Sequence, residues 1–353
     1  MQRRDPHVAF VWPGLPDYAA RCIRAVIDQH PGPITVVASR PSVPIEGMER
    51  SLGRNIVWLD GKDKNISWPS LNLPVPNVLF CGGYATPAFN SLAKQVWAAN
   101  GAVVLMSDNN WHGHLRHRFL DRIRQSQMLQ TRANGVFVPG ASAFSVARAW
   151  GYEPKDIETN LYGADPSVFH GGSALASRPK TFLFVGQFIH RKNVLTLTDA
   201  FLRFADAFPD WALRLCGHGP LADTIPIHPR IHTHGFVQPA ELAVIMRDAR
   251  CLVLPSREEH WGLVVHEAAL SGSALLLSSA VGAAYDLAVP ENAILFPPSN
   301  TGALVRAMCT LASWTDDRWS LAEEVSKRLA SKFGPIPFAN SVLSFVRRFS
   351  DIA

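Results

Sequence analysis

Cysteines are few and scattered: the 353 residues hold five, with no C-x-x-C pair among them. An odd number without pairing argues against a disulfide framework and a structural zinc site, and it fits a reducing compartment. Apolar runs are short as well, since none reaches the roughly 18–20 residues that a membrane-spanning helix needs. The N-terminus has only a brief apolar stretch before Pro13, in contrast to a secretory signal. A cytoplasmic protein is expected.

Charged residues make up 18% of the chain and leave a formal net charge of only +5. So small a basic excess, without a recognition motif, argues against nucleic acid as a partner, but it suits phosphate ligands or an anionic membrane. Hydrophobic residues reach 47%, which excludes a disordered chain. The length suits two domains rather than a single core.

Short apolar runs alternate with helical patterns along most of the chain, for example a strand at 7–12 followed by a helix at 17–30. The alternation restarts at 181–188, after a stretch at 161–180 that is rich in Gly, Ser and Pro, has no periodicity and predicts a linker. Alternating strands and helices predict parallel sheets with helices on both faces. The expected fold class is therefore α/β, with two Rossmann-like, doubly wound parallel-sheet domains.

The expected domain boundaries give an N-terminal domain over 1–170, a C-terminal domain over 171–334 and a final helix over 335–353. Packing back on the N-terminal domain is one of the two options for that helix. Ligands of such folds bind beyond the carboxyl ends of the strands, so the loops that follow the strands are the places to search for a site.

The densest signal is LVLPSREEHWGLVVHEAALSG, residues 252–272. A strand ends there, Glu259 lies in the following loop, and a helix that begins near Gly262 carries Glu267. Gly262 lets the backbone approach a ligand, and the N–H groups at a helix start favour an anion. Carboxylates beside an anion are tolerable where they accept hydrogen bonds from hydroxyls. The pattern predicts two carboxylates for sugar hydroxyls around backbone amides that hold a diphosphate.

This stretch resembles the E-x7-E signature of the retaining family 4 glycosyltransferases of the group 1 type, which have the GT-B fold. Four more segments resemble the family's motifs in the same order: LYGADPSVF (161–169), FVGQFIHRKN (184–193), CGHGP (216–220) and HGFVQPAEL (234–242). The resemblance covers about 161–320, whereas the first 160 residues match only in general layout. It implies two domains that face a central cleft, the N-terminal one on the acceptor side and the C-terminal one binding a nucleotide sugar.

The resemblance also implies roles for individual residues. Lys192 would bind the diphosphate of the nucleotide sugar and assist its departure. Glu267 would take the ribose hydroxyls, and Glu259 the hydroxyls of the transferred sugar. The backbone around Gly262 would hold the phosphates. The donor-binding set implied by the same motifs also includes Gly186, Gly235, Phe236, Leu263 and Val264.

One position departs from the family. The family has an arginine five residues before the lysine, whereas this chain has Gln187, which brings no charge to a phosphate. Either Arg191, the neighbour of Lys192, compensates as a donor-binding cation, or the site is weaker.

The N-terminal domain is expected to contribute two residues. Gly14 lies in the turn after the first strand, where the family approaches the donor diphosphate with paired glycines. Asp108 follows the strand that begins at 102, near the place of a family histidine that contacts the sugar. Asp108 is the catalytic candidate here, and a cap for the following helix is the alternative role that stays open.

No D-x-D sequence occurs anywhere in the chain. Enzymes that hold a diphosphate through a divalent metal usually need such paired acids. The histidines at 112, 114 and 117 fit no common zinc-site spacing. No metal and no cofactor are expected, and the nucleotide sugar is a substrate.

The segment 114–132 carries five arginines together with apolar residues at helical spacing. A basic amphipathic helix can bind anionic lipid head groups or an acidic acceptor. A helix that packs by its apolar stripe and leaves its cations in solvent explains the pattern equally well. Peripheral attachment to the inner face of a membrane therefore stays open.

Together these features predict a retaining, metal-independent glycosyltransferase that moves a sugar from a nucleotide-diphosphate sugar to a glycan or lipid-linked acceptor. The resemblance places such enzymes in the synthesis of cell-envelope polysaccharide or lipopolysaccharide. Two alternatives stay open. One is a GT-B nucleotide-sugar epimerase or phosphorylase, and the other is a non-catalytic GT-B-like binding partner, which Gln187 suggests.

Overall fold

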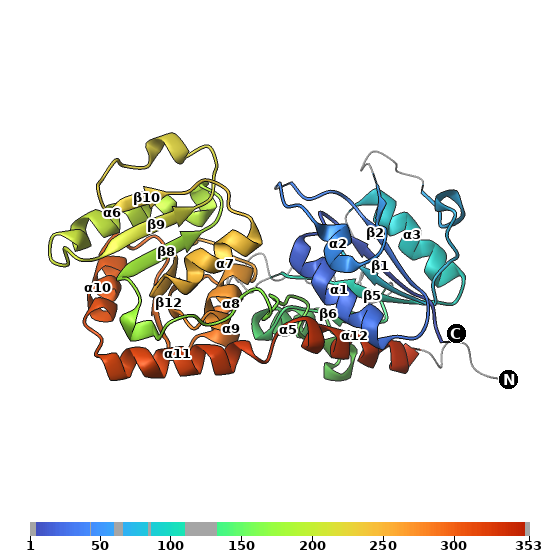
Figure 1. Cartoon of the computed structure of the whole chain (residues 1–353). Helices are drawn as coiled ribbons and strands as arrows, with labels where there is room; N and C mark the ends of the chain where they lie inside the picture. Colours follow the sequence, from blue (N-terminus) through green and yellow to red (C-terminus); the bar gives the residue numbers. More distant parts are fainter. Residues whose placement is uncertain (1–4, 43, 60–65, 84–85, 110–132, 350–353) are drawn as a thin grey trace. The chain divides into compact units, whose positions relative to one another are not determined.

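The computed structural model describes residues 5–42, 44–59, 66–83, 86–109 and 133–349 (Figure 1). The chain divides into two compact units: unit 1 is Met1–Gly163 with Phe333–Ala353, and unit 2 is Ala164–Lys332. Both divisions lie earlier in the chain than the expected boundaries at 170 and 334. The first one differs because the segment after Gly163 is bound into unit 2.

Unit 1 contains, among its described residues, a parallel sheet of seven strands in the order β3-β2-β1-β4-β5-β6-β7. Its strands are β1 (Val8–Trp12), β2 (Ile34–Ala38), β3 (Val57–Trp58), β4 (Val78–Cys81), β5 (Ala102–Met106), β6 (Gly135–Phe137) and β7 (Ile157–Glu158). Its helices are α1 (Asp17–Gln29), α2 (Met48–Leu52), α3 (Pro87–Ala98), α5 (Ala141–Ala149) and α12 (Pro335–Phe349), with 3-10 turns η1 (Pro69–Leu71) and η2 (Pro154–Asp156).

Successive residues of β1 enter two different cores. Val8, Phe10 and Trp12 join the apolar cluster that includes α1 and α12, whereas Ala9 and Val11 join the cluster that includes α3. Side chains of a strand alternate between the two faces of its sheet. The sheet of unit 1 is therefore covered by helices on both faces, which explains why its strands are continuous apolar runs.

The last helix, α12, is part of the core of unit 1. In Figure 1 it lies beside α1, with which it is in contact. The ring centroid of Phe338 is 5.1 Å from that of Phe137 and 6.2 Å from that of Phe10. Phe345 packs edge-on against Phe80 at 6.0 Å. These aromatic contacts join the end of the chain to its first strands.

Unit 2 contains, among its described residues, a parallel sheet of six strands in the order β10-β9-β8-β11-β12-β13. Its strands are β8 (Thr181–Val185), β9 (Ala212–Cys216), β10 (Ile231–Thr233), β11 (Cys251–Leu254), β12 (Ala274–Ser278) and β13 (Ala293–Phe296). Its helices are α6 (Val194–Ala205), α7 (Pro239–Arg247), α8 (Leu263–Leu270), α9 (Ala284–Leu287), α10 (Thr301–Ala312) and α11 (Asp316–Ala330), with 3-10 turns η3 (Leu175–Ser177), η4 (His190–Lys192) and η5 (Ala222–Thr224). The two parallel sheets confirm the predicted fold class.

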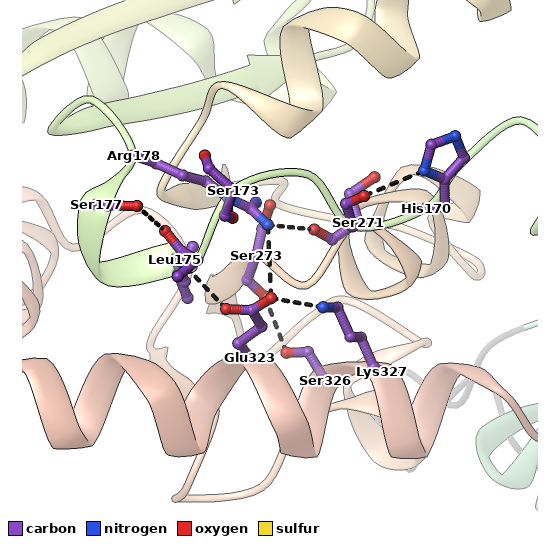
Figure 2. A network of polar contacts seen from close by, with 12 residues as sticks. His170, Ser173, Leu175, Ser177, Arg178, Ser271, Ser273, Glu323, Ser326 and Lys327 are labelled. Carbon is purple, nitrogen blue, oxygen red and sulfur yellow. Dashed lines mark hydrogen bonds and ion pairs between the residues drawn. The ribbon is translucent and has the colours of Figure 1, made fainter.

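The prediction of a linker over 161–180 is wrong for its second half, because Arg178 anchors that part in unit 2 (Figure 2). The Arg178 side chain is fully buried, and its guanidinium donates to the carbonyls of Ser173, Ala249 and Ser271 at 3.0, 3.3 and 2.8 Å. Glu323 of α11 lies 4.0 Å from the same guanidinium and accepts a hydrogen bond from the Leu175 N–H at 2.8 Å. The segment has the composition of a linker, but Arg178 within it is a buried charge with several hydrogen-bond partners.

Replacing Arg178 with Met is expected to lower the free energy of unfolding by about 3 kcal/mol, because three buried carbonyls lose their donor. Lys180→Ala is the matched control, since Lys180 forms an exposed ion pair with Asp210, and such pairs contribute less than about 1 kcal/mol. Urea denaturation followed by tryptophan fluorescence measures both changes. Equal losses in the two variants would contradict the anchoring role.

Candidate active site

The predicted donor-binding residues of unit 2 lie in loops that follow parallel strands. Gly186 and Lys192 follow β8, Gly235 follows β10, and Glu259 follows β11. Because the strands are parallel, their carboxyl ends lie at the same edge of the sheet. This edge is where ligands bind in open α/β folds.

The turns after β8 and β9 approach each other backbone to backbone. The Gly186 N–H donates to the Cys216 carbonyl at 3.0 Å, and the Gly217 N–H donates to the Gly235 carbonyl at 2.6 Å. A Cβ atom on Gly217 would lie 1.9 Å from the Gly186 carbonyl oxygen, so a larger residue does not fit there. This close approach explains the C-G-H-G-P sequence and brings three of the loops together. Beyond them, the Phe236 ring lies edge-on to His218 at 6.0 Å.

The loop after β8 is also fastened to the loop after β11. Asn193, a buried residue, donates from Nδ2 to the Pro255 carbonyl at 3.1 Å. The Arg257 N–H donates to the Arg191 carbonyl at 2.8 Å, and Arg191 Nη1 donates to the Glu258 carbonyl at 2.9 Å. These contacts fix the two loops that carry Lys192 and Glu259 relative to each other.

Lys192 and Glu259 form an ion pair at the centre of this arrangement. Lys192 Nζ binds Glu259 Oε2, and Arg191 Nη1 lies 3.8 Å from Glu259 Oε1. The Ser256 hydroxyl donates to Glu259 Oε2 at 3.1 Å and is itself fully buried. The side chains of Lys192 and Glu259 are 13% and 10% exposed, whereas that of Arg191 is 41% exposed. Two cations thus face one carboxylate.

The N-terminus of α8 lies next to this charged group along the chain. Gly262 precedes the helix with a φ of 88°, and no side chain caps the first turn. A Cβ atom at Gly262 would lie 3.0 Å from Glu259 Cγ, so the absence of a side chain leaves room for the carboxylate stem. Leu263 and Val264, the first helical residues, are half-buried. The positive end of the helix dipole adds to the attraction for an anion.

Glu267 and His266 are neighbours on α8 but have different environments. Glu267 is half-buried, whereas His266 is fully buried. The Ala164 N–H donates to His266 Nδ1 at 3.0 Å, and His266 Nε2 is 2.9 Å from the Ala330 carbonyl, which requires the proton on Nε2. Burial lowers the pKa of His266 to about 4. A neutral histidine therefore ties α8 to the end of α11 and to the start of unit 2.

The structure brings together Lys192, Arg191 and Glu259, as the predicted roles require, but their roles toward a donor stay predictions. Gln187 is exposed, and its carbonyl accepts from the Ile189 N–H at 3.0 Å. Ser256 is a member of the site for which the sequence predicted no role, although its position directly after a strand and three residues before Glu259 is a signal for one.

Gly14 and Asp108 belong to unit 1. Gly14 lies in the turn after β1, and its N–H donates to the Ser39 hydroxyl at 2.8 Å. Asp108 follows β5, and its Oδ2 accepts a hydrogen bond from the Tyr162 hydroxyl at 2.9 Å. Burial raises the pKa of Tyr162 well above its usual value, so the phenol acts as a neutral donor. The catalytic role of Asp108 stays a prediction.

The segment 114–132 and the histidines at 112, 114 and 117 lie outside the described residues. The helix that Asp108 would cap lies outside them as well. Within the described ranges, no group of three or more His, Cys, Asp or Glu side chains is placed to hold a metal ion. No helix in the described part of the chain is long and apolar enough to cross a membrane.

Comparison with known proteins shows which family this part of the chain resembles. Residues 179–313 match the model of the family described as "Glycosyl transferases group 1". Those residues include β8, the Lys192–Glu259 pair and α8. This part of the chain is therefore similar to the glycosyl transferases group 1 family. The D-inositol 3-phosphate glycosyltransferase of Corynebacterium kroppenstedtii is 26% identical over 257 residues, which cover 65% of this chain and 55% of that protein.

The chain spans about half the length of the curated relatives that it matches. Two solved structures resemble it over nearly all of their length. Anabaena HepE in complex with UDP and glucose has a TM-score of 0.74 at 14% identity, covering 97% of this chain and 99% of that one. Sucrose-phosphate synthase from Thermosynechococcus elongatus has a TM-score of 0.74 at 16% identity, covering 99% and 100%. The predicted GT-B fold is thereby confirmed.

Stability should fall as the pH drops from 6.5 toward 4, because the unfolded chain protonates His266 in a range where the folded chain does not. At pH 5 the loss from this group is about 2 kcal/mol relative to pH 7.5. Urea midpoints of the wild type and of His266→Asn at both pH values measure it. The variant is less stable at pH 7.5 but has a flatter pH dependence; parallel pH profiles would refute the assignment.

Proposed function

We propose that this chain is a retaining, metal-independent glycosyltransferase that takes its sugar from a nucleoside diphosphate sugar. The observation that carries the proposal is the meeting of Lys192, Arg191 and Glu259 beside the uncapped start of α8. Cations and a helix start suit a diphosphate, and a carboxylate suits sugar hydroxyls. The structurally similar HepE was solved in complex with UDP and glucose, and this complex and the glycosyltransferase relatives support the same ligand class.

In this proposal the residues act on the leaving group. As the bond between the sugar's anomeric carbon and the phosphate oxygen breaks, negative charge grows on the departing diphosphate. Lys192, Arg191 and the N–H groups at the start of α8 stabilise that charge. The acceptor hydroxyl attacks from the face that the diphosphate leaves, and its proton goes to the departing phosphate oxygen. No separate nucleophile is required.

The remaining site residues take the roles that family 4 enzymes imply. Glu267 accepts hydrogen bonds from the ribose and Glu259 from the transferred sugar, and Asp108 of unit 1 is the further catalytic candidate. The acceptor is a glycan or a lipid-linked sugar, as in the synthesis of cell-envelope polysaccharide.

A melting-temperature screen against UDP-, GDP-, ADP- and TDP-sugars tests the donor class, because a ligand that binds the folded state raises the melting temperature. The stabilising donor should then support transfer in the presence of EDTA, with retained anomeric configuration by NMR. No shift with any donor, or activity lost to EDTA and restored by manganese, would count against the proposal. Binding without turnover would favour a non-catalytic partner, and an epimerised or free sugar would favour the other alternative.

Lys192→Ala should lose turnover about a hundredfold, because a cation that strengthens its contact with the growing charge lowers the barrier. Arg191→Ala should act mainly on donor affinity, because its side chain is 41% exposed against 13% for Lys192. Steady-state kinetics separate the two effects. The reverse pattern would show that the loop is aligned to the family wrongly by one residue.

A further inference from the structure

The two partners of the Lys192–Glu259 pair are held very differently. Glu259 is fixed on three sides: its N–H donates to the Ala280 carbonyl at 3.2 Å, its carbonyl accepts from the Gly282 N–H at 3.0 Å, and its carboxylate accepts from the Ser256 hydroxyl. The Ser256 carbonyl in turn accepts from the buried Ser278 hydroxyl at 2.5 Å. The carboxylate is therefore anchored to the end of β12 as well as to its own loop.

Lys192 reaches the same carboxylate only through its flexible side chain. It ends the short η4 turn, where its N–H donates to the Ile189 carbonyl at 3.0 Å. Its Cδ and Cε atoms would lie 3.7 Å from a Cβ atom on Gly186, which is ordinary van der Waals distance. A four-carbon stem with an ammonium at its tip reorients easily. Of the two partners, Lys192 is therefore held by fewer contacts.

The charges around the pair act on an incoming anion. Arg191 and Arg257 flank Lys192 in the joined loops, while Glu259 and Glu258 are the carboxylates that follow β11. The two loops thus carry three cations and two carboxylates, and Glu267 on α8 adds a third carboxylate to the site. The attraction for an incoming diphosphate therefore comes from the cations and the start of α8 rather than from a net positive charge. The diphosphate is nevertheless repelled by the carboxylate of Glu259. This carboxylate is already paired with Lys192, the least exposed of the three cations.

We propose that Glu259 is a built-in counter-ion that binds Lys192 until a nucleoside diphosphate takes the place of the Glu259 carboxylate. Lys192 then passes from carboxylate to phosphate, and Glu259 becomes available to the hydroxyls of the attached sugar. This inference rests on the proposed function, since it takes a nucleoside diphosphate sugar as the ligand. The consequence is a preference for the nucleotide sugar over the free nucleotide. Only the nucleotide sugar brings hydroxyls that donate hydrogen bonds to Glu259 after Lys192 has left it.

The test is the affinity for whichever of UDP, GDP, ADP and TDP stabilises the wild type most, measured by calorimetry. Glu259→Gln removes the competing carboxylate and should bind this nucleoside diphosphate about fivefold more tightly. The same variant should lose most of the wild-type preference for the sugar nucleotide over the free nucleotide. A role in sugar contact alone would leave the affinity for the free nucleotide unchanged.

Glu258→Gln is the matched control, because it removes the same charge from the same loop. The Glu258 carboxylate is 45% exposed and lies 3.4 Å from His260 rather than on Lys192. Its affinity for the nucleotide should stay within about twofold of the wild type.

The outcomes distinguish a failure of the counter-ion exchange from a failure of the proposed glycosyltransferase function. The counter-ion exchange is overturned if Glu259→Gln leaves nucleotide affinity unchanged or weakens it, or if Glu259→Gln and Glu258→Gln raise it equally. The proposed function then still stands. No binding of any nucleoside diphosphate to the wild type overturns both. If Glu259→Gln does not fold, Glu259→Asp, which withdraws the carboxylate by one methylene, should give a smaller gain in the same direction.

Discussion

Close approach of backbone to backbone is the constraint on which the candidate site depends. The turns after β8, β9 and β10 are joined through Gly217, where even a methyl group would meet the Gly186 carbonyl. Once these turns are in place, the loop that carries Lys192 has one position beside the loop after β11, and the contacts of Asn193 and Arg191 hold it there. Backbone packing therefore brings the side chains of Lys192, Arg191 and Glu259 together, and few further side-chain contacts are needed to place them.

Most of the fold could be predicted from the sequence because buried parallel strands are short, continuous apolar runs bounded by turn residues. Helices α10 and α11 received no prediction, although Asn300 and Thr315 are caps whose side chains accept from Ala303 and Arg318 N–H groups. Helix α11 is rich in charge, so its apolar stripe is narrow and easily missed. The anchoring of 164–180 was missed for another reason: Arg178 is a charged residue in a polar segment, and only the fold shows that it is buried.

The candidate site could be predicted as a set of residues but not as a set of contacts. The resemblance to family 4 implied Lys192 and Glu259 separately, one for phosphate and one for sugar, and they lie 67 positions apart in the sequence. That they bind each other follows from the neighbouring positions of β8 and β11 in the sheet, which no local pattern reveals. Ser256 and His266 were overlooked because a serine after a strand and a histidine within a helix have many ordinary explanations, and only their partners distinguish them.

The placement of α12 has a consequence for how the chain is made. Unit 2 is one continuous stretch, whereas unit 1 needs Phe338 and Phe345 from the end of the chain to fill the core around Phe10 and Phe80. During synthesis these residues leave the ribosome after the whole of unit 2, so the unit that begins first is completed second. Until α12 has been synthesised, one apolar face of the unit 1 sheet lacks the helix that buries it. A premature stop shortly before Pro335 would therefore damage the amino-terminal half of the protein, which a linear view of the gene would regard as intact.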